Sequence, residues 1–436
     1  MAIIGILGFL SAMVLMLWGS MRGYHIIILT VLASVILAVS NQLPLYDTLF
    51  AGSQSFTAGM TSFIGRYFVI FLLSAVLAKY IENSGAAQSI AQYMILKTGK
   101  KNPYVILVAL FAFASILTLG GVNLFVAMFV FIPLARNLFQ ELDMSWKLVV
   151  TPYMMGVGSF TMTTMPGTPA IQNVIIADIL GTSLTVQPVF GLILSSFLIV
   201  YTLWRMKVEL KDSLAKEEGF EDRFRVKETK ENERIPSFAR SISPLLLLFL
   251  TIIIGSAIQV ENVILYALSF AVILSVLIFN PFIDSQRDIL NMGAVNSITS
   301  VMAPAVTLGF GTVMSNTPSF EMIMDFFQGL PLTPLLSLII ITAILQFIIG
   351  SASGVLSIVG EKFVPLYDLS GYDLGYVHRM LLTTPAFMPP HVGAYLTFLD
   401  VSKLTHKDSF RQVMISLNGG VLLTVVLGYL LGFIFN

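Results

Sequence analysis

The stretch PLLSLIIITAILQFIIGSASG, residues 334–354, decides the fold class of this chain. Residues 334–349 carry no charged side chain and approach the roughly 20 apolar residues that a helix needs to cross a bilayer. Small and polar residues then interrupt the run, beginning with Gly350, and residues 350–366 stay apolar but broken. We expect a membrane helix followed by a half-helix or a hairpin that turns back inside the bilayer.

A second interruption follows at MPPHVGA, residues 388–394, inside a broken apolar segment over 380–399. Pro389 and Pro390 lack an N–H group and release carbonyls that a regular helix would pair. Unpaired backbone groups at membrane depth cost several kcal/mol unless protein or a water-filled cavity satisfies them. Both interruptions are therefore expected at a cavity, where a solute would bind.

The first half of the chain repeats this order of features. The stretch LGGVNLFV at 119–126 precedes an apolar run, and MPGTPA at 165–170 is a proline break inside the interrupted segment 147–181. Paired interruptions at matching positions are typical of transporters built from structural repeats. We expect two inverted repeats, over about residues 20–204 and 243–436, related by a two-fold axis in the membrane plane.

The composition places most of the chain in a membrane. Of its 436 residues, 56% are hydrophobic and 11% are charged, with a mean hydropathy of +0.87, whereas ordinary soluble domains are about 25% charged. We expect an all-α polytopic membrane protein with ten or more crossings, in which the apolar start is a true first span. A further interrupted segment covers residues 296–318. The candidate spans are about 3–18, 25–39, 67–80, 103–119, 122–138, 189–204, 244–258, 263–279, 334–349 and 417–435.

Residues 205–240 interrupt the apolar pattern with charge. They hold ten of the 24 Lys and Arg residues and nine of the 24 Asp and Glu residues. Such a segment cannot lie in lipid, and its Lys and Arg beside two spans predict a cytoplasmic position. We interpret it as a solvated linker, which divides the chain into a first membrane half at 1–204, a linker at 205–242 and a second membrane half at 243–436.

The composition also excludes several functions. Positive and negative residues balance at 24 each, which gives no electrostatic support for a nucleic-acid partner. The sequence has no cysteine, so disulfides, thiolate metal sites and cysteine nucleophiles are excluded. Its four histidines show no metal-ligand spacing. We therefore expect that the protein is not an enzyme and that it has neither a metal site nor a cofactor. The only ion expected is the one that drives transport.

Broken helices that face a cavity favour an anionic solute, because they present free N–H groups and the positive ends of helix dipoles. Donor side chains flank the breaks and the glycine clusters in both halves. No Arg or Lys lies inside these four clusters, so a small monocarboxylate or hydroxy acid fits better than a dense polyanion. The donors are Asn123, Thr161, Thr163, Thr164, Thr168, Gln172, Asn173, Ser351 and Ser353.

His391 is an ionisable residue inside the second broken segment, directly after two prolines. Ionisable residues at membrane depth are functional candidates, and histidine titrates near neutral pH. We expect its imidazole to face the cavity and to couple transport to protons. Glu361 and Asp400, which flank apolar runs in the second half, are the next candidates for a proton carrier.

Four stretches resemble the gluconate:proton symporter family, within a wider ion-transporter superfamily of carriers with two repeats. The resemblance covers about residue 20 to the end of the chain and includes LTHK at 404–407. The four stretches are IENSGAAQSIA at 81–91, PGTP at 166–169, GSAS at 350–353 and PHVGA at 390–394.

The resemblance implies proton-driven uptake of sugar acids or short hydroxy acids across the bacterial cytoplasmic membrane. It also implies a homodimer with a static scaffold and a mobile transport domain of the elevator type. Gluconate-type members usually carry a histidine in the first proline break, where this chain reads MPGTPA, so a carboxylate less hydroxylated than gluconate is expected. Matched by position, the implied substrate-lining residues are Asn123, Thr164, Thr168, Asn173, Ser351, Ser353 and His391.

Two alternatives stay open from the sequence. A sodium-coupled carboxylate symporter of the same fold would bind Na⁺ through unwound backbone carbonyls together with Asn123, Ser351 and Ser353. An anion channel, the alternative from another class, needs a ring of carbonyls or charges. The sequence contains neither a filter repeat nor a charged pore stripe, which favours a carrier.

Overall fold

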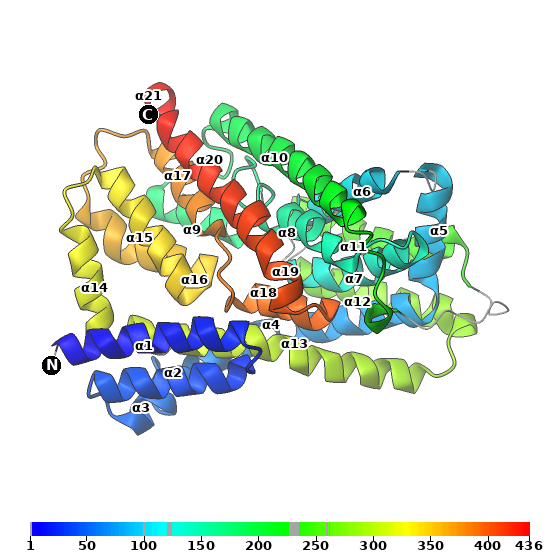
Figure 1. Ribbon diagram of the computed structural model, residues 1–436, viewed down its shortest axis with the longest axis horizontal. Helices are drawn as coiled ribbons and strands as arrows, with labels where there is room; N and C mark the ends of the chain where they lie inside the picture. The colour runs from blue at the N-terminus through cyan, green and yellow to red at the C-terminus, as the bar shows by residue number, and fades with distance from the viewer. Residues whose placement is uncertain are drawn as a thin grey trace.

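The computed structural model of this chain describes residues 2–98, 102–119, 124–168, 170–225, 235–258, 260 and 262–436. Throughout these ranges the regular elements are helices, and no strand occurs among them (Figure 1). The prediction of an all-helical chain is confirmed. Six helices in the same ranges are long and apolar enough to cross a membrane, at Ile3–Met21, Phe56–Asn83, Pro188–Ala215, Val263–Phe282, Gln286–Ser315 and His406–Leu430.

The helices follow one another with short connections. In chain order they are α1 (Ala2–Met21), α2 (Ile26–Ser40), α3 (Leu45–Leu49), α4 (Phe56–Asn83), α5 (Ala86–Thr98), α6 (Pro103–Leu119), α7 (Leu124–Glu141), α8 (Val150–Gly158), α9 (Ile171–Leu180), α10 (Pro188–Ala215), α11 (Phe238–Ala257), α12 (Val263–Phe279), α13 (Gln286–Ser315), α14 (Pro318–Gln328), α15 (Pro334–Ile349), α16 (Ala352–Ile358), α17 (Leu374–Thr383), α18 (Gly393–Ser402), α19 (His406–Gln412), α20 (Gly419–Leu430) and α21 (Gly432–Phe435). Short 3₁₀ turns occur at Trp146–Val149, Asp222–Phe224, Asn280–Phe282, Val364–Leu366 and Thr384–Ala386, and π-helical turns at Val359–Phe363 and Val413–Asn418.

Two long helices, α4 and α13, pack along each other, one from each half of the chain. Glycines make this close approach possible. A Cβ atom on Gly309 would lie 2.6 Å from the carbonyl oxygen of Phe56, and one on Gly293 would lie 2.8 Å from the Cα of Val76. Helices α2 and α12 pack against the same pair, and α1 packs on α2 (Figure 1). We call this group the crossing layer.

The remaining membrane helices include two broken ones, of which the second lies against the crossing layer through α13. Between α8 and α9 the described residues of 159–170 are not regular helix, and a second irregular stretch, 387–392, precedes α18. Helix α9 packs on α16 and α17, and α18 packs on α7 and α13. Each broken helix therefore contacts elements from the other half of the chain. Figure 1 shows α10, α17 and α20 on the side of the molecule away from α1 and α2.

The charged segment is more ordered than a free linker where the structure describes it. Helix α10 continues to Ala215, so the predicted boundary at residue 204 falls inside it. Phe220 and Phe224 are buried, and the ring of Phe220 packs edge-on against Trp146. The backbone N–H of Phe220 donates to the Asp143 carboxylate at 2.9 Å. These contacts fix the segment against the end of α7.

Candidate functional site

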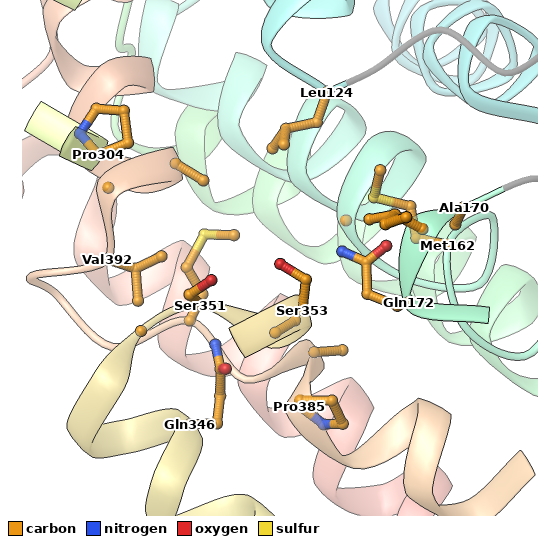
Figure 2. A pocket seen from close by; sticks show the side chains of 18 of the residues that line it. Leu124, Met162, Ala170, Gln172, Pro304, Gln346, Ser351, Ser353, Pro385 and Val392 are labelled. Atoms are coloured by element: carbon orange, nitrogen blue, oxygen red, sulfur yellow. The ribbon is translucent and has the colours of Figure 1, made fainter. Parts of the chain in front are cut away.

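A cavity of about 350 Å³ lies where the broken helices meet (Figure 2). Described parts of all four predicted clusters line it. They are Leu124 and Phe125 from the first glycine cluster, Ala170 from the first break, the hairpin turn after α15, and Val392 with its neighbours in the second break. Side chains of α4, α12 and α13 complete the wall. One cavity thus takes residues from both halves of the chain, and from both the crossing layer and the broken helices.

Helix amino ends converge on this cavity. Helices α7, α9 and α18 begin with lining residues, and so does α16, which continues into a π-helical turn. The residues that precede α9 and α18, Ala170 and Val392, have no side chain that caps the first turn. The first N–H groups of these helices therefore lack a side-chain cap among the described residues, although the N–H of Asn173 in α9 donates to the carbonyl of Ala170 at 2.9 Å. Several helix dipoles place positive ends at one location. Such an arrangement binds anions.

Polar side chains of two kinds line the cavity. Thr118, Thr163 and Thr307 each donate to a carbonyl of their own helix or turn, so their hydroxyls are partly occupied. In contrast, Ser353 makes no hydrogen bond to any described residue, and the side-chain oxygen of Gln172 is buried without a partner in the described part of the chain. Figure 2 shows Gln172 and Ser353 facing each other across the cavity.

A positively charged side chain also lines the cavity, although the four sequence clusters contain none. Arg66 is on α4, within the first half of a 28-residue apolar helix. Its guanidinium lies 5.5 Å from the ring centre of Tyr67 and forms no ion pair with any residue that the structure describes. Charged side chains in membrane helices face cavities or partners because lipid solvates them poorly. The four clusters themselves contain no Lys or Arg; α4 supplies this positive charge from outside them.

Two predicted site residues line the cavity. Ser351 and Ser353 lie at the start of α16 and point toward the open space (Figure 2). The Ser351 hydroxyl accepts a hydrogen bond from the N–H of Gly354 at 3.4 Å, which caps α16. Asn123 lies outside the described residues.

Three other predicted residues lie behind the first break rather than at the cavity. The Thr164 hydroxyl is 2.8 Å from that of Ser195 on α10, and the Thr168 hydroxyl donates to the carbonyl of Thr161 at 2.5 Å. Asn173 donates to the carbonyl of Thr168 at 2.8 Å. All three predicted side chains are buried, and they hold the shape of the irregular stretch.

His391 is fully buried and does not line the cavity, contrary to the expectation that its ring faces the polar space. Its Nε2 is 3.3 Å from the carbonyl oxygen of Ile348. Its Nδ1 has no hydrogen-bond partner in the described ranges. A Cβ on Gly350 would lie 3.7 Å from the ring, so the imidazole sits directly behind the hairpin turn.

The other two ionisable candidates lie elsewhere. The side chain of Glu361 is outside the described part of the structure. Asp400 accepts a hydrogen bond from Ser300 at 3.2 Å and one from Lys403 at 3.3 Å. It lines a second cavity of about 110 Å³, together with Lys79, Glu82 and Arg136.

Sequence reasoning missed the groups that support the two breaks. On α17, His378 Nε2 is 2.8 Å from the side-chain oxygen of Asn173. Its neighbour Arg379 donates to the carbonyls of Val186 and Leu184 at 2.9 and 2.8 Å. The adjacent His378 and Arg379 in an otherwise apolar segment were the sequence signal that could have identified these supporting groups. At the second break, Asn418 accepts from the N–H of Met388 at 2.7 Å and donates to its carbonyl at 3.1 Å.

Comparisons with known proteins found a matching family model and two relatives. A family model described as "GntP family permease" matches residues 1–368. The chain is 27% identical over 453 residues to a protein of Bacillus subtilis (strain 168) named uncharacterized transporter YxjC, covering 93% of this chain and 94% of that protein. It is 26% identical over 392 residues to the gluconate permease of the same organism, covering 82% of this chain and 84% of that protein.

Proposed function

Because this chain belongs to the GntP permease family, whose members are multi-pass membrane transporters and not enzymes, we propose that it carries a small organic carboxylate by cation-coupled symport. One observation carries the proposal. Uncapped amino ends of α9 and α18, one from each half of the chain, begin at the same cavity. Converging helix amino ends stabilise a negative charge even without a metal ion or a basic side chain.

The substrate class follows from the lining of the cavity. Arg66 adds one positive charge, and the remaining lining residues are neutral. One carboxylate therefore balances the site, whereas a dense polyanion would leave negative charge unpaired at membrane depth. A sugar acid or a short hydroxy acid meets this requirement, and a relative of the chain is named a gluconate permease.

The packing supports an alternating-access mechanism of the elevator type. We assign α4 and α13 to a static scaffold, and the broken helices with α7, α10, α16 and α17 to a transport domain. In this proposal the two halves are inverted repeats, because α9 packs on α16 of the second half as α18 packs on α7 of the first. The carrier is proposed to act as a homodimer in the bacterial cytoplasmic membrane.

The coupling ion is proposed to be a proton bound by His391. A carboxylate in the cavity favours the charged imidazolium behind the hairpin turn, because opposite charges stabilise each other. Glu361 and Asp400 are the next candidates. Sodium is the second candidate ion, since the hydroxyls of Ser351 and Ser353 offer oxygen ligands at the cavity.

Uptake into proteoliposomes tests the function and the ion together. With an inward proton gradient in sodium-free buffer, we expect the protein to concentrate labelled lactate or gluconate above the external level. His391→Gln should retain the contact to Ile348 and equilibrate substrate without concentrating it. The control His25→Gln changes a histidine that caps α2 by accepting from the N–H of Ile27, and should concentrate substrate normally.

Three other outcomes of the uptake experiment would each contradict part of the proposal. Accumulation driven by a sodium gradient alone would identify Na⁺, and not the proton, as the coupling ion. Equilibration without accumulation by the unmodified protein under either gradient would indicate a channel. Accumulation by His391→Gln equal to that of the unmodified protein would remove His391 from the coupling mechanism.

A further inference from the structure

The second cavity, of about 110 Å³, has walls from both groups of helices. Helices α4 and α13 form one wall, and α7 and α18 form the other. Arg136 on α7 connects this region to the charged segment, because its guanidinium and the ring of Phe220 both pack on Trp146. The cavity therefore lies at the end of the molecule where the charged segment lies, the end that the sequence predicts to be cytoplasmic.

The charged side chains that line this cavity leave one positive charge without a carboxylate partner. Lys79 forms an ion pair with Glu82 at 2.7 Å, and Lys403 forms one with Asp400 at 3.3 Å. Arg136, the remaining charged lining residue, forms no ion pair with any residue that the structure describes, and Glu82 acts on it only from beyond ion-pair distance. Three cations and two carboxylates give the lining a net charge of +1.

Arg136 also keeps hydrogen-bond donors free for a ligand. Its Nη2 donates to the carbonyls of Val401 and Ser402 at 3.2 and 3.3 Å, at the end of α18. Its Nε and Nη1 make no hydrogen bond to a described residue, and of these two atoms only Nε is buried. The two N–H bonds of Nη1 therefore remain available to a group that carries acceptors.

The opening of the cavity borders an apolar outer surface. Asn296 and Thr299 on α13 line the cavity and are exposed. Beside them on the same helix, Val295 and Ile298 are 64% and 55% exposed. A polar cavity next to exposed apolar side chains of a membrane helix matches the two parts of a lipid, its headgroup and its acyl chains.

We propose that this cavity binds the phosphate group of an anionic phospholipid. One phosphodiester carries one negative charge, which balances the net charge of the lining. Basic pockets between membrane helices on the cytoplasmic side are suited to anionic headgroups, because the lipids of that leaflet are negatively charged. The volume equals that of about three to four water molecules at roughly 30 Å³ each, which admits a phosphate group, while the acyl chains lie outside along α13.

Ligand-induced thermal stabilisation of the purified full chain in neutral detergent tests the site. The probes are phosphatidylglycerol, phosphatidylcholine with the same acyl chains, and inorganic phosphate. Phosphatidylcholine has the same phosphodiester, but its headgroup also carries a positive charge. We expect phosphatidylglycerol to bind about tenfold or more tightly than either of the other probes, as a hydrogen-bonded charge pair requires.

Two variants remove positive charge from the cavity. In Arg136→Gln the preference for phosphatidylglycerol over phosphatidylcholine should fall to near one. Lys403→Gln changes a side chain that is 67% exposed, and it should also lower the preference, because Asp400 then keeps an unpaired negative charge. Lys403→Gln decides the question alone if Arg136→Gln does not fold.

Arg287→Gln is the matched control. Arg287 is also on α13 and is 84% exposed, 3.5 Å from Asp288, and it does not line the cavity. Its replacement should keep the preference for phosphatidylglycerol. An equal loss in Arg287→Gln and Arg136→Gln would indicate general attraction between the protein and anionic lipid and would overturn the proposal.

Three further results would also overturn it. They are equal affinities of the unmodified protein for the two lipids, an unchanged preference in both cavity variants, and inorganic phosphate binding as tightly as phosphatidylglycerol, which would assign the site to a free anion. None of these results bears on the proposed carboxylate transport, because the two cavities share no lining residue and the probes contain no carboxylate.

Discussion

At the scale of single residues, lining the cavity and shaping it are separate tasks. Ser351 and Ser353 reach the open space, whereas Thr164, Thr168 and Asn173 satisfy backbone and side-chain groups behind the first break. Polar residues beside a proline break are needed for both tasks, because released carbonyls must find donors. Their sequence position does not indicate which task each performs.

Arg66 provides the residue-scale prediction. Arg66→Gln removes the positive charge at the cavity, and we expect the affinity for a stabilising carboxylate to fall about tenfold or more, since hydrogen bonds to charged groups contribute roughly 1.5–3 kcal/mol. Thermal stability without ligand should change little, because the guanidinium forms no ion pair with a described residue. Titration by thermal shift or calorimetry measures both quantities.

Arg22→Gln is the control for that change. The Arg22 guanidinium also lies 5.5 Å from an aromatic ring, that of Trp18, and both arginines are exposed, but Arg22 lies just after the end of α1 and does not line the cavity. Its replacement should leave carboxylate affinity unchanged. Equal affinities in Arg66→Gln and the unmodified protein would show that the helix amino ends hold the anion without help from α4.

At the scale of elements, the sequence predicted the helical class and the interruptions near 159–170 and 387–392. The predicted interruption over 296–318 is wrong, because most of that segment lies in the continuous helix α13, which accommodates Pro304. Hydrophobic runs and prolines determine these features locally, so they can be read from short stretches. The sequence could not predict that α4 brings Arg66 to the cavity, because this depends on how α4 and α13 pack across the chain. It also could not show that His391 points behind the hairpin turn, since the backbone path through 387–392 sets that direction.

The contact between α13 and α18 carries the prediction at this scale. The Thr397 hydroxyl on α18 donates to the carbonyl of Ser300 on α13 at 3.2 Å, so the two helices touch where the proposed scaffold meets the transport domain. The chain lacks cysteine, which leaves Ser300→Cys/Thr397→Cys as the only reactive pair. Joining this pair with a short reducible thiol cross-linker should stop uptake into proteoliposomes, and reduction should restore it.

Thr164→Cys/Ser195→Cys is the matched pair inside the proposed transport domain. The two hydroxyls are 2.8 Å apart, one on the first break and the other on α10. A cross-link there should leave uptake nearly unchanged. Full uptake by a completely cross-linked Ser300→Cys/Thr397→Cys variant would exclude relative motion of α13 and α18.

At the scale of the whole molecule, the chain folds into two groups of helices with a cavity at their contact. Within the crossing layer, α4 and α13 make close glycine contacts, which suit a rigid interface. The broken helices place uncapped ends at the cavity and are held from behind by His378, Arg379 and Asn418. These supports keep irregular backbone in place, so that its N–H groups stay available to an anion.

The central claim is that this cavity holds the carboxylate of the transported solute. An experimental structure of the protein in lipid nanodiscs, saturated with the acid that stabilises it most, tests the claim directly. We predict that the carboxylate lies in the cavity within about 2.7–3.2 Å of backbone nitrogens at the start of α9 or α18, with Arg66 oriented toward it. A carboxylate bound outside this cavity, or bound inside it away from both helix amino ends, would contradict the account.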